Sequence, residues 1–336
     1  MNRILVVNVN WVGDVVFSTP LIKALRKKFP RAYIACMVVP RCKEALEGNP
    51  HLNEIIIYDE DGIHRSPFGK LRLISGLRSK RFEAAILLHR SFTRSLLVSL
   101  AGIPRRIGYY RRKRDFLITD VVELPPDDTH RVDFFLSLGK PLGISLDDRN
   151  YEFFISEDDR KKARNFLKSE GLGDSGTLIA INPGGNWGPK RWPRENFSET
   201  ANELVKQYNA KIVITGALKD LALAEGIASL MKQRPIISCG KTTLKEAAAI
   251  FERANLVISN DSGPMHIAVA MGAHTIALFG PTSPRITGPI GRGRSIILHE
   301  DVGCRIPCYN FSCSEYKCME AIKPQDILNA AEKLLK

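Results

Sequence analysis

The stretch Ile4-Leu5-Val6-Val7-Asn8-Val9-Asn10-Trp11-Val12-Gly13-Asp14 joins an apolar run to a turn that ends in one acid. The run over residues 3–9 is typical of a strand in a parallel sheet that is covered on both faces. In an open α/β sheet, ligands bind just beyond the carboxyl ends of the strands. Asp14 is therefore expected at a ligand site, where its carboxylate can act as a base. The alternative is a plain acid in the first turn of a helix.

The same pattern recurs along both halves of the chain. In the first half, residues 32–39, 54–58 and 82–88 have strand character, and residues 21–29 and 92–101 have helical spacing. In the second half, strands are predicted at 177–182, 211–215, 235–238, 256–259 and 275–279, and a last helix at 324–335. Alternation of this kind predicts two doubly wound α/β domains with parallel sheets, facing a central cleft.

A change in character between the halves marks the domain boundary. Residues 156–162 are polar and charged, and Ser156 followed by Asp159 resembles a helix-capping arrangement. We predict a first domain over 1–155, a linker over 156–176, a second domain over 177–322 and a C-terminal helix over 323–336. A chain of 336 residues is long enough for two such domains.

Charge and composition limit the partners. The formal net charge is +13, and much of the excess lies in two basic groups, residues 64–81 and 105–114. The candidate partners are nucleic acid, an anionic membrane surface or a small anionic substrate, and the alternative is a solvated basic face. No apolar run approaches the roughly 18 residues that span a bilayer, and the N-terminus lacks signal-peptide features. We therefore expect a cytoplasmic protein.

Four of the seven cysteines lie close together, as Cys304, Cys308, Cys313 and Cys318. Their spacing lacks the C-x2-C pair of common zinc sites. Bound zinc, disulfides and reduced thiols in a compact loop all remain open from the residues.

The second half carries strand-to-helix junctions suited to an anion. Residues 177–182 lead into Gly184-Gly185 and then Lys190, and residues 256–259 lead into Asp261-Ser262-Gly263 and His266. Amide groups at helix starts, with the helix dipole, attract phosphate or carboxylate. Taken singly, the glycines can be plain turns, Asp261 or Ser262 a helix cap, and His266 a core histidine.

Together these motifs resemble glycosyltransferase family 9. The resemblance rests on residues 12–14, 183–185, 190–193, 260–266, 279–284 and 101–109, in that order over nearly the whole chain. Within the family, the chain is most similar to the ADP-heptose:lipopolysaccharide heptosyltransferases, more to the second transferase than to the first.

The resemblance implies a GT-B fold of two Rossmann-like domains and an inverting, metal-independent transfer. It implies no cofactor, and ADP-heptose as the donor substrate. Asp14 matches the general base. The donor-binding positions match Gly184, Gly185, Lys190, Gly216, Asp220, Asp261, Ser262, Gly263 and His266. A family 9 transferase with another nucleotide sugar or acceptor is the alternative.

The implied acceptor is the lipopolysaccharide core, which is anionic and suits the basic first half. The candidates to bind it are Gly13 and five arginines, Arg90, Arg94, Arg105, Arg106 and Arg111. The arginines are chosen because a guanidinium can donate two parallel hydrogen bonds to a carboxylate or a phosphate. The same charge predicts peripheral contact with the inner face of the inner membrane. A basic nucleic-acid-binding protein is a remote alternative, since no RRM, KH or zinc-finger pattern is present.

Overall fold

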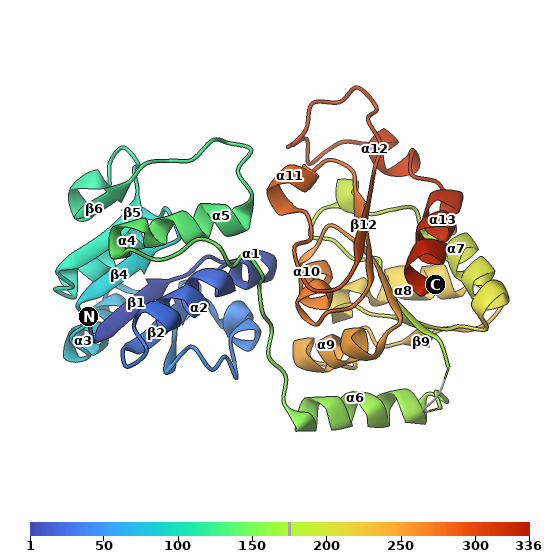
Figure 1. The fold of residues 1–336 in the computed structure, drawn as a ribbon, viewed down its shortest axis with the longest axis horizontal. Helices are drawn as coiled ribbons and strands as arrows, with labels where there is room; N and C mark the ends of the chain where they lie inside the picture. The colour runs from blue at the N-terminus through green and yellow to red at the C-terminus, as the bar shows by residue number, and fades with distance from the viewer. Residues whose placement is uncertain (174–175) are drawn as a thin grey trace. The chain divides into compact units, whose positions relative to one another are not determined.

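The computed structural model describes residues 1–173 and 176–336, and the chain forms two compact units, Met1–Phe154 and Ile155–Lys336. In Figure 1 the first unit runs from blue to green and the second from green to red. Each unit is a parallel sheet with helices on both faces.

In the first unit the strand order is β3-β2-β1-β4-β5-β6. The strands are β1 (Arg3–Val7), β2 (Tyr33–Val38), β3 (Glu54–Ile57), β4 (Ala84–Leu87), β5 (Arg105–Tyr109) and β6 (Asp120–Val122). The helices are α1 (Val12–Phe17), α2 (Thr19–Lys28), α3 (Pro67–Ser79), α4 (Phe92–Leu100) and α5 (Arg131–Leu136), with 3₁₀ turns η1 (Pro40–Ala45), η2 (Asp115–Leu117) and η3 (Ser137–Leu142).

The centre of this sheet is the most apolar part of the unit. β1 lies between β2 and β4, and Val7 and Leu87 are fully buried at the ends of β1 and β4. Helices α3 and α4 cover one face, where Leu73, Leu77 and Val98 join the same core as Val7. The predicted strands are present, each within two residues of its expected bounds. β5 and β6 were not predicted, because β5 opens with two arginines and β6 is short.

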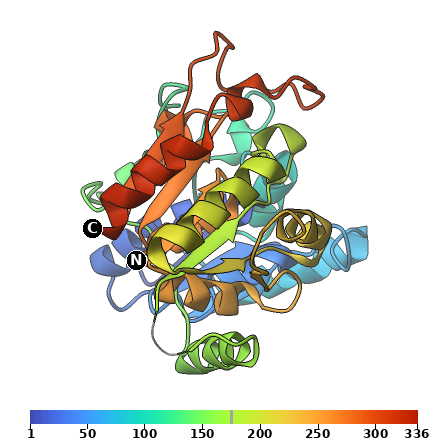
Figure 2. The ribbon, with the colours of Figure 1, turned by 90° about the vertical axis from the view of Figure 1, so that its right-hand side faces the viewer.

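In the second unit the strand order is β12-β11-β10-β7-β8-β9. The strands are β7 (Leu178–Asn182), β8 (Lys211–Ile214), β9 (Ile236–Ile237), β10 (Leu256–Asn260), β11 (Thr275–Phe279) and β12 (Ser295–His299). The helices are α6 (Glu157–Ser169), α7 (Arg194–Tyr208), α8 (Leu221–Ala228), α9 (Leu244–Arg253), α10 (Gly263–Ala270), α11 (Pro284–Thr287), α12 (Lys317–Glu320) and α13 (Pro324–Leu335), with 3₁₀ turns η4 (Gly188–Lys190) and η5 (Leu218–Asp220). Helices α7 and α13, far apart in sequence, lie side by side (Figure 2).

Both sheets have the doubly wound order of a Rossmann domain, in which the first strand is central and the order reverses beside it. The predicted α/β fold class, with two Rossmann-like doubly wound domains, is confirmed. In each unit the reversal lies between the first and fourth strands, β1 and β4 in one and β7 and β10 in the other.

The segment predicted as a linker, 156–176, contains α6. Ser156 begins this helix with the expected cap, because its Oγ accepts the Asp159 amide at 3.1 Å. Arg160 on α6 binds Glu252 on α9 through its Nε at 2.7 Å, so the helix packs within the second unit. Residues 174–175 of the predicted linker lie outside the described residues.

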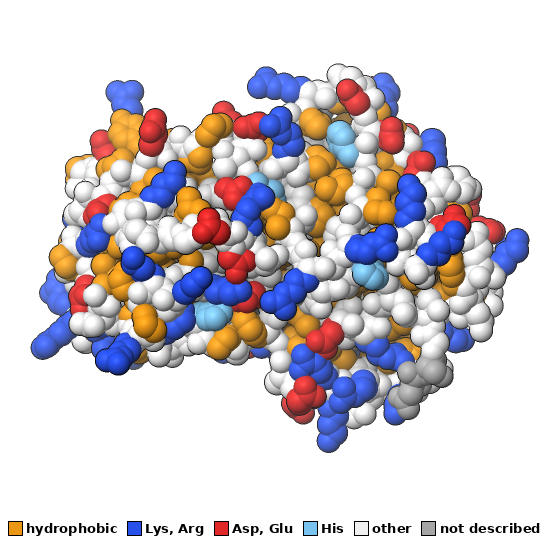
Figure 3. Space-filling view, in the orientation of Figure 1, with side chains coloured by type: hydrophobic (Ala, Val, Ile, Leu, Met, Phe, Trp, Pro, Cys, Tyr) orange, Lys and Arg blue, Asp and Glu red, His pale blue; other side chains and the backbone are white. Residues whose placement is uncertain are grey.

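Basic side chains are spread over the visible face of both units, with acidic and apolar side chains between them (Figure 3). Within the described residues, no helix is both long and apolar enough to cross a bilayer.

Candidate functional site

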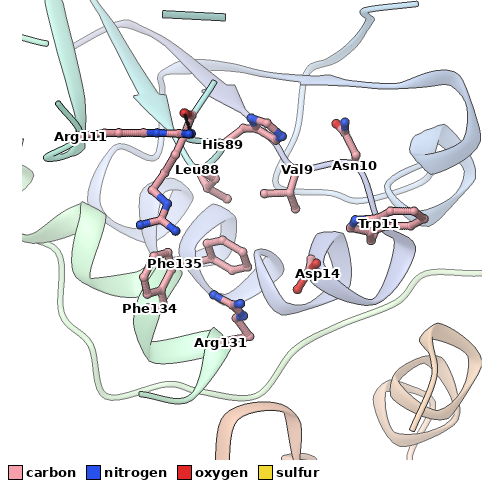
Figure 4. Close-up of a pocket in the computed structure, with 11 residues that line it drawn as sticks. Val9, Asn10, Trp11, Asp14, Leu88, His89, Arg111, Arg131, Phe134 and Phe135 are labelled. Atoms are coloured by element: carbon pink, nitrogen blue, oxygen red, sulfur yellow. Dashed lines mark hydrogen bonds between the residues drawn. The ribbon is translucent and has the colours of Figure 1, made fainter. Parts of the chain in front are cut away.

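The first unit has an open cavity of about 320 Å³ at the carboxyl ends of β1 and β4. The strand order reverses at this point, which is where open α/β sheets bind ligands. The cavity is lined by Val9, Asn10, Trp11, Asp14, Leu88, His89, Arg90, Arg111, Arg131, Phe134 and Phe135. Figure 4 shows the Asp14 carboxylate and the Arg131 guanidinium on the same side of this cavity.

Asp14 reaches the cavity because of how α1 begins. The strand β1 ends at Val7, the chain turns through Trp11, and α1 places Asp14 in its first turn. The next residues, Val15 and Val16, are fully buried and hold the short helix against the unit. The structure thus places the predicted acid in a cavity at a strand end, and its role as a base stays a prediction.

Arg94 braces the loop that carries Asp14. Its side chain is nearly fully buried, and its guanidinium donates to the Asn8 carbonyl at 2.6 Å and to Asn10 Oδ1 at 2.5 Å. Glu60 Oε2 lies 3.3 Å from Arg94 Nη2 and supplies the compensating charge. These contacts hold the guanidinium inside the loop rather than on its surface. The structure gives Arg94 a bracing role, and its predicted contact with the acceptor stays a prediction.

Arg114 braces the neighbouring loop. Its guanidinium donates to the carbonyl of His89 at 3.0 Å, to Ser95 Oγ at 3.1 Å and to the carbonyl of Tyr109 at 2.9 Å. Burial, together with the nearby guanidinium of Arg111, lowers the pKa of Arg114 to about 10, so it stays cationic at neutral pH.

The other predicted acceptor residues separate into two groups. Arg90 and Arg111 line the cavity, and Arg111 Nη1 donates to the Arg90 carbonyl at 2.7 Å. Arg105 and Arg106 open β5, so they lie at the amino edge of the sheet, opposite the cavity. There Arg105 binds Asp120 at 2.7 Å, and Arg106 donates to the carbonyl of Leu117 at 2.7 Å.

The structure therefore does not bring Arg105 and Arg106 to the cavity, and their predicted contact with the acceptor stays a prediction. Gly13 precedes Asp14 in α1 and is not among the residues that line the cavity.

Sequence reasoning missed several residues of the cavity, above all Arg131 and His89. Arg131 begins α5, more than a hundred residues beyond Asp14, and no local pattern links the two. His89 comes shortly after β4, and its position after the end of a strand was the sequence signal that could have placed it at the cavity. Within the described residues, its Nδ1 is buried without a hydrogen-bond partner. Burial and the charges of Arg94, Arg114 and Arg111 lower the pKa of His89 to about 4, so the imidazole is neutral.

The second unit gathers polar side chains at its own reversal point, where β7 and β10 end. Asn182 closes β7 and Asn260 closes β10, and both are buried. Asn260 Nδ2 donates to the Pro183 carbonyl at 2.7 Å, and Ser262 Oγ donates to Asn182 Oδ1 at 3.3 Å. These bonds tie the loop after β7 to the loop after β10. Ser262 occupies the N-cap position of α10 but makes no side-chain cap bond.

Lys190 and Asp261 meet at this place. Lys190 Nζ lies 2.6 Å from Asp261 Oδ2 and 5.0 Å from the ring centre of Trp187. Asp261 also accepts from Thr282 Oγ1 at 2.7 Å, and His266 Nε2 lies 3.7 Å from its Oδ1. Burial alone would raise the pKa of Asp261, but the His266 contact and the Lys190 charge outweigh it and hold the pKa well below its usual range. The carboxylate is therefore ionised.

Two glycines let Asp220 approach the same loop. A Cβ on Gly184 would lie 3.1 Å from the Asp220 carboxyl group, and one on Gly216 would lie 2.9 Å from Asp220 Cβ. Asp220 is buried, and its Oδ2 accepts the Ala217 amide at 3.0 Å. Within the described residues, its Oδ1 has no hydrogen-bond partner.

The remaining donor-site candidates belong to the two loops. The Gly185 carbonyl accepts from Arg191 Nη2 at 3.0 Å, which holds the loop after β7. Gly263 is the first residue of α10, and His266 is buried in its second turn. The structure thus brings together Gly184, Gly185, Lys190, Gly216, Asp220, Asp261, Ser262, Gly263 and His266 at one edge of the sheet.

The cysteine-rich loop adjoins this edge. The Cys308 amide donates to the Pro281 carbonyl at 2.7 Å, and the Phe311 ring lies 4.8 Å from the ring of Trp187. Within the described residues, Cys304, Cys308, Cys313 and Cys318 are free thiols, and no group of three or more His, Cys, Asp or Glu side chains is placed to hold a metal ion.

Comparison with known proteins identifies the family. The model of glycosyltransferase family 9 (heptosyltransferase) matches residues 70–318. Lipopolysaccharide heptosyltransferase 2 of Escherichia coli K12 is 29% identical over 309 residues, which cover 88% of this chain and 87% of that protein.

Two solved structures agree with this match. A family 9 glycosyl transferase from Veillonella parvula has a TM-score of 0.89 at 29% identity, covering 99% of this chain and 97% of that one. The ADP-heptose LPS heptosyltransferase II of E. coli has a TM-score of 0.83 at 26% identity, covering 99% and 98%.

Proposed function

The chain belongs to glycosyltransferase family 9, and from this premise we propose that it is an inverting, metal-independent heptosyltransferase of lipopolysaccharide core assembly. Its donor is ADP-L-glycero-D-manno-heptose, and its acceptor is the heptose- and Kdo-bearing inner core. The observation that carries the proposal is the match, over 88% of the chain, to lipopolysaccharide heptosyltransferase 2.

Asp14 is the general base in this proposal. The cavity around it takes the acceptor, and Arg90, Arg111 and Arg131 on its wall supply positive charge for an anionic core. The Asp14 carboxylate removes the proton of the acceptor hydroxyl as that oxygen attacks the anomeric carbon. A positioned base of this kind contributes about 10²–10⁴-fold to the rate.

The edge of the second sheet takes the nucleotide sugar. The diphosphate lies at the ends of β7 and β10, near Lys190 and the first amides of α10. As the bond to the anomeric carbon breaks, negative charge grows on the diphosphate, and Lys190 stabilises it electrostatically. ADP leaves without a general acid, so one carboxylate suffices, whereas glycosidases usually need two.

Lys190 is held for this role by its neighbours. Asp261 and the Trp187 ring fix its ammonium group within the site, so little side-chain entropy is lost when the donor binds. The reaction needs no cofactor, and the protein works in the cytoplasm, in peripheral contact with the inner membrane.

A product assay tests the proposal. The protein is incubated with ADP-heptose and either a Kdo-bearing or a monoheptosylated core acceptor, and the product is identified by mass. We expect an acceptor one heptose heavier, and no such product from Asp14→Asn, which retains the volume of the side chain. Donor binding by that variant should persist. Near-normal turnover by Asp14→Asn would remove Asp14 as the base, and absence of product from the unmodified chain would favour a family 9 activity with another nucleotide sugar or acceptor.

A further inference from the structure

Large apolar side chains stand exposed on the first unit, in two segments that we call the rim segments, residues 63–72 and 110–116. Ile63 is 71% exposed, Phe68 78%, Leu71 62% and Phe116 72%. Such side chains are unfavourable in water, and several on one surface usually mark an interaction site.

Both rim segments follow carboxyl ends of strands in one parallel sheet. Residues 63–72 follow β3 and enter α3, while residues 110–116 follow β5. Phe92, at the start of α4 after β4, contacts Phe116 with their ring centres 6.3 Å apart. Since α3 packs against α4, the segments share the edge of the sheet that also carries the Asp14 cavity.

The first rim segment is held in place. His64 is buried, and its Nδ1 accepts the Asp59 amide at 3.0 Å. Ser66 caps α3 by accepting the Gly69 amide at 3.0 Å. Ile63, Phe68 and Leu71 are therefore presented to solvent by an ordered framework.

Basic residues are interleaved with these apolar side chains. Residues 63–72 include Arg65, Lys70 and Arg72 and no acid. Residues 110–116 include three basic residues besides the buried Arg114, and Asp115 as the only acid. A second copy of the chain would bring like charges together, which is costly. An anionic bilayer instead accommodates both kinds of side chain in the rim segments. Its interior takes up the apolar side chains, and its headgroups attract the basic ones.

We propose that the rim segments dock the first unit on an anionic lipid bilayer, with the Asp14 cavity at the membrane surface. This inference rests on the proposed function for the identity of the acceptor. A lipid-anchored acceptor would then reach the cavity without leaving the membrane. Phe68, Leu71 and Phe116 insert among the lipids, and Arg65, Lys70, Arg112 and Lys113 contact the headgroups.

Vesicle co-sedimentation tests docking without nucleotide sugar or acceptor, so the result does not depend on the transferase activity. The probes are vesicles of phosphatidylcholine alone and of phosphatidylcholine with an equal part of phosphatidylglycerol. We expect binding to the mixed vesicles, and at least about tenfold weaker binding for Phe68→Ser/Leu71→Ser. The matched control is Leu230→Ser, an exposed leucine of the second unit.

A second variant tests the charges. Arg112→Gln/Lys113→Gln should weaken binding to the mixed vesicles by about 30-fold, from roughly fivefold for each basic residue near the surface. The control replaces two exposed lysines of the second unit, Lys206→Gln/Lys232→Gln. Binding by the rim variants equal to that of both controls would overturn the proposal. So would a dimer in solution that Phe68→Ser/Leu71→Ser dissociates, because it would assign the surface to a second copy.

Activity separates this inference from the proposed function. Phe68→Ser/Leu71→Ser should retain transfer to a deacylated, water-soluble acceptor and lose it on the same acceptor embedded in vesicles. Equal activity of this variant on both forms would contradict docking while leaving the transferase intact. Absence of transfer by the unmodified chain would contradict the proposed function, while the vesicle binding would still test docking.

Discussion

At the residue scale, Lys190 and Asp261 form a buried charge pair in the second unit's site, with side chains 15% and 5% exposed. Removing one partner of such a pair leaves the other charge uncompensated, which is more costly than losing both. The pair thus has a structural role in addition to the proposed phosphate contact of Lys190. A single and a double variant separate these two roles.

Lys190→Ala should raise the KM for the donor at least about tenfold, because it removes a charge-assisted contact to the diphosphate. It should also lower the free energy of unfolding by roughly 3 kcal/mol, because Asp261 stays buried and ionised. In Lys190→Ala/Asp261→Asn the unfolding free energy should recover while the donor KM stays high. Urea denaturation and steady-state kinetics measure the two effects. Recovery of the donor KM in the double variant would show that Lys190 acts only through structure.

His89 should make stability depend on pH. Its pKa is lowered to about 4 in the folded chain, mainly by burial and then by Arg94. Between about pH 4 and pH 6.5 the unfolded chain therefore binds more protons, so stability rises with pH in that window and is lost as pH falls. After allowance for solvent screening, the effect is on the order of 1–2 kcal/mol.

Urea denaturation between pH 4.5 and 7 measures this pH dependence of the free energy of unfolding. We expect a flatter profile for His89→Gln than for the unmodified chain, with His299→Gln in the other unit as the control for loss of an imidazole. Parallel profiles for the unmodified chain and His89→Gln would contradict the assignment.

At the scale of elements, short helices and loops at the strand ends carry both candidate sites. α1 is a six-residue helix and α10 an eight-residue helix, and each follows a central strand after a short loop. The Gly and Asp residues at these turns made them recognisable from sequence. The bracing of the loops by Arg94 and Arg114 was not recognisable, because the local sequence around an arginine is the same whether its side chain faces solvent or a carbonyl group.

The cysteines divide by element in a way that thiol titration can check. Cys36, Cys42 and Cys239 are buried, and burial raises their pKa values to about 12, 11 and 12. With Ellman's reagent at neutral pH, we expect the four thiols of the loop 304–318 to react in the folded chain, and all seven in denaturant. Burial raises the pKa of Cys318, so it should be the slowest of the four. Labelling of the loop only after a chelator or a reductant would indicate bound metal or disulfides.

At the scale of the whole molecule, the net charge of +13 should make membrane contact depend on salt. The Debye length falls from about 10 Å at 0.1 M to about 3 Å at 1 M, so attraction between exposed basic side chains and anionic lipid is screened. Binding to phosphatidylglycerol-containing vesicles should drop at least about tenfold over that range in co-sedimentation. Partitioning that does not change with salt would contradict a role for the charge.

The amino-acid sequence by itself determined the two parallel sheets, the turns that end their central strands, and Asp14 and Lys190 as candidates, because these follow from local patterns of apolar, glycine and charged residues. Only the tertiary structure decided which arginines reach the first cavity. Arg94 and Arg114 are buried and donate to carbonyl groups of the loops. Arg105 and Arg106 lie at the amino edge of the sheet. Arg131 lines the cavity from α5, which is distant in the sequence. The physical reason is that a guanidinium binds whichever carbonyl or carboxylate the fold brings within reach, and that neighbour is set by packing between elements far apart in the chain.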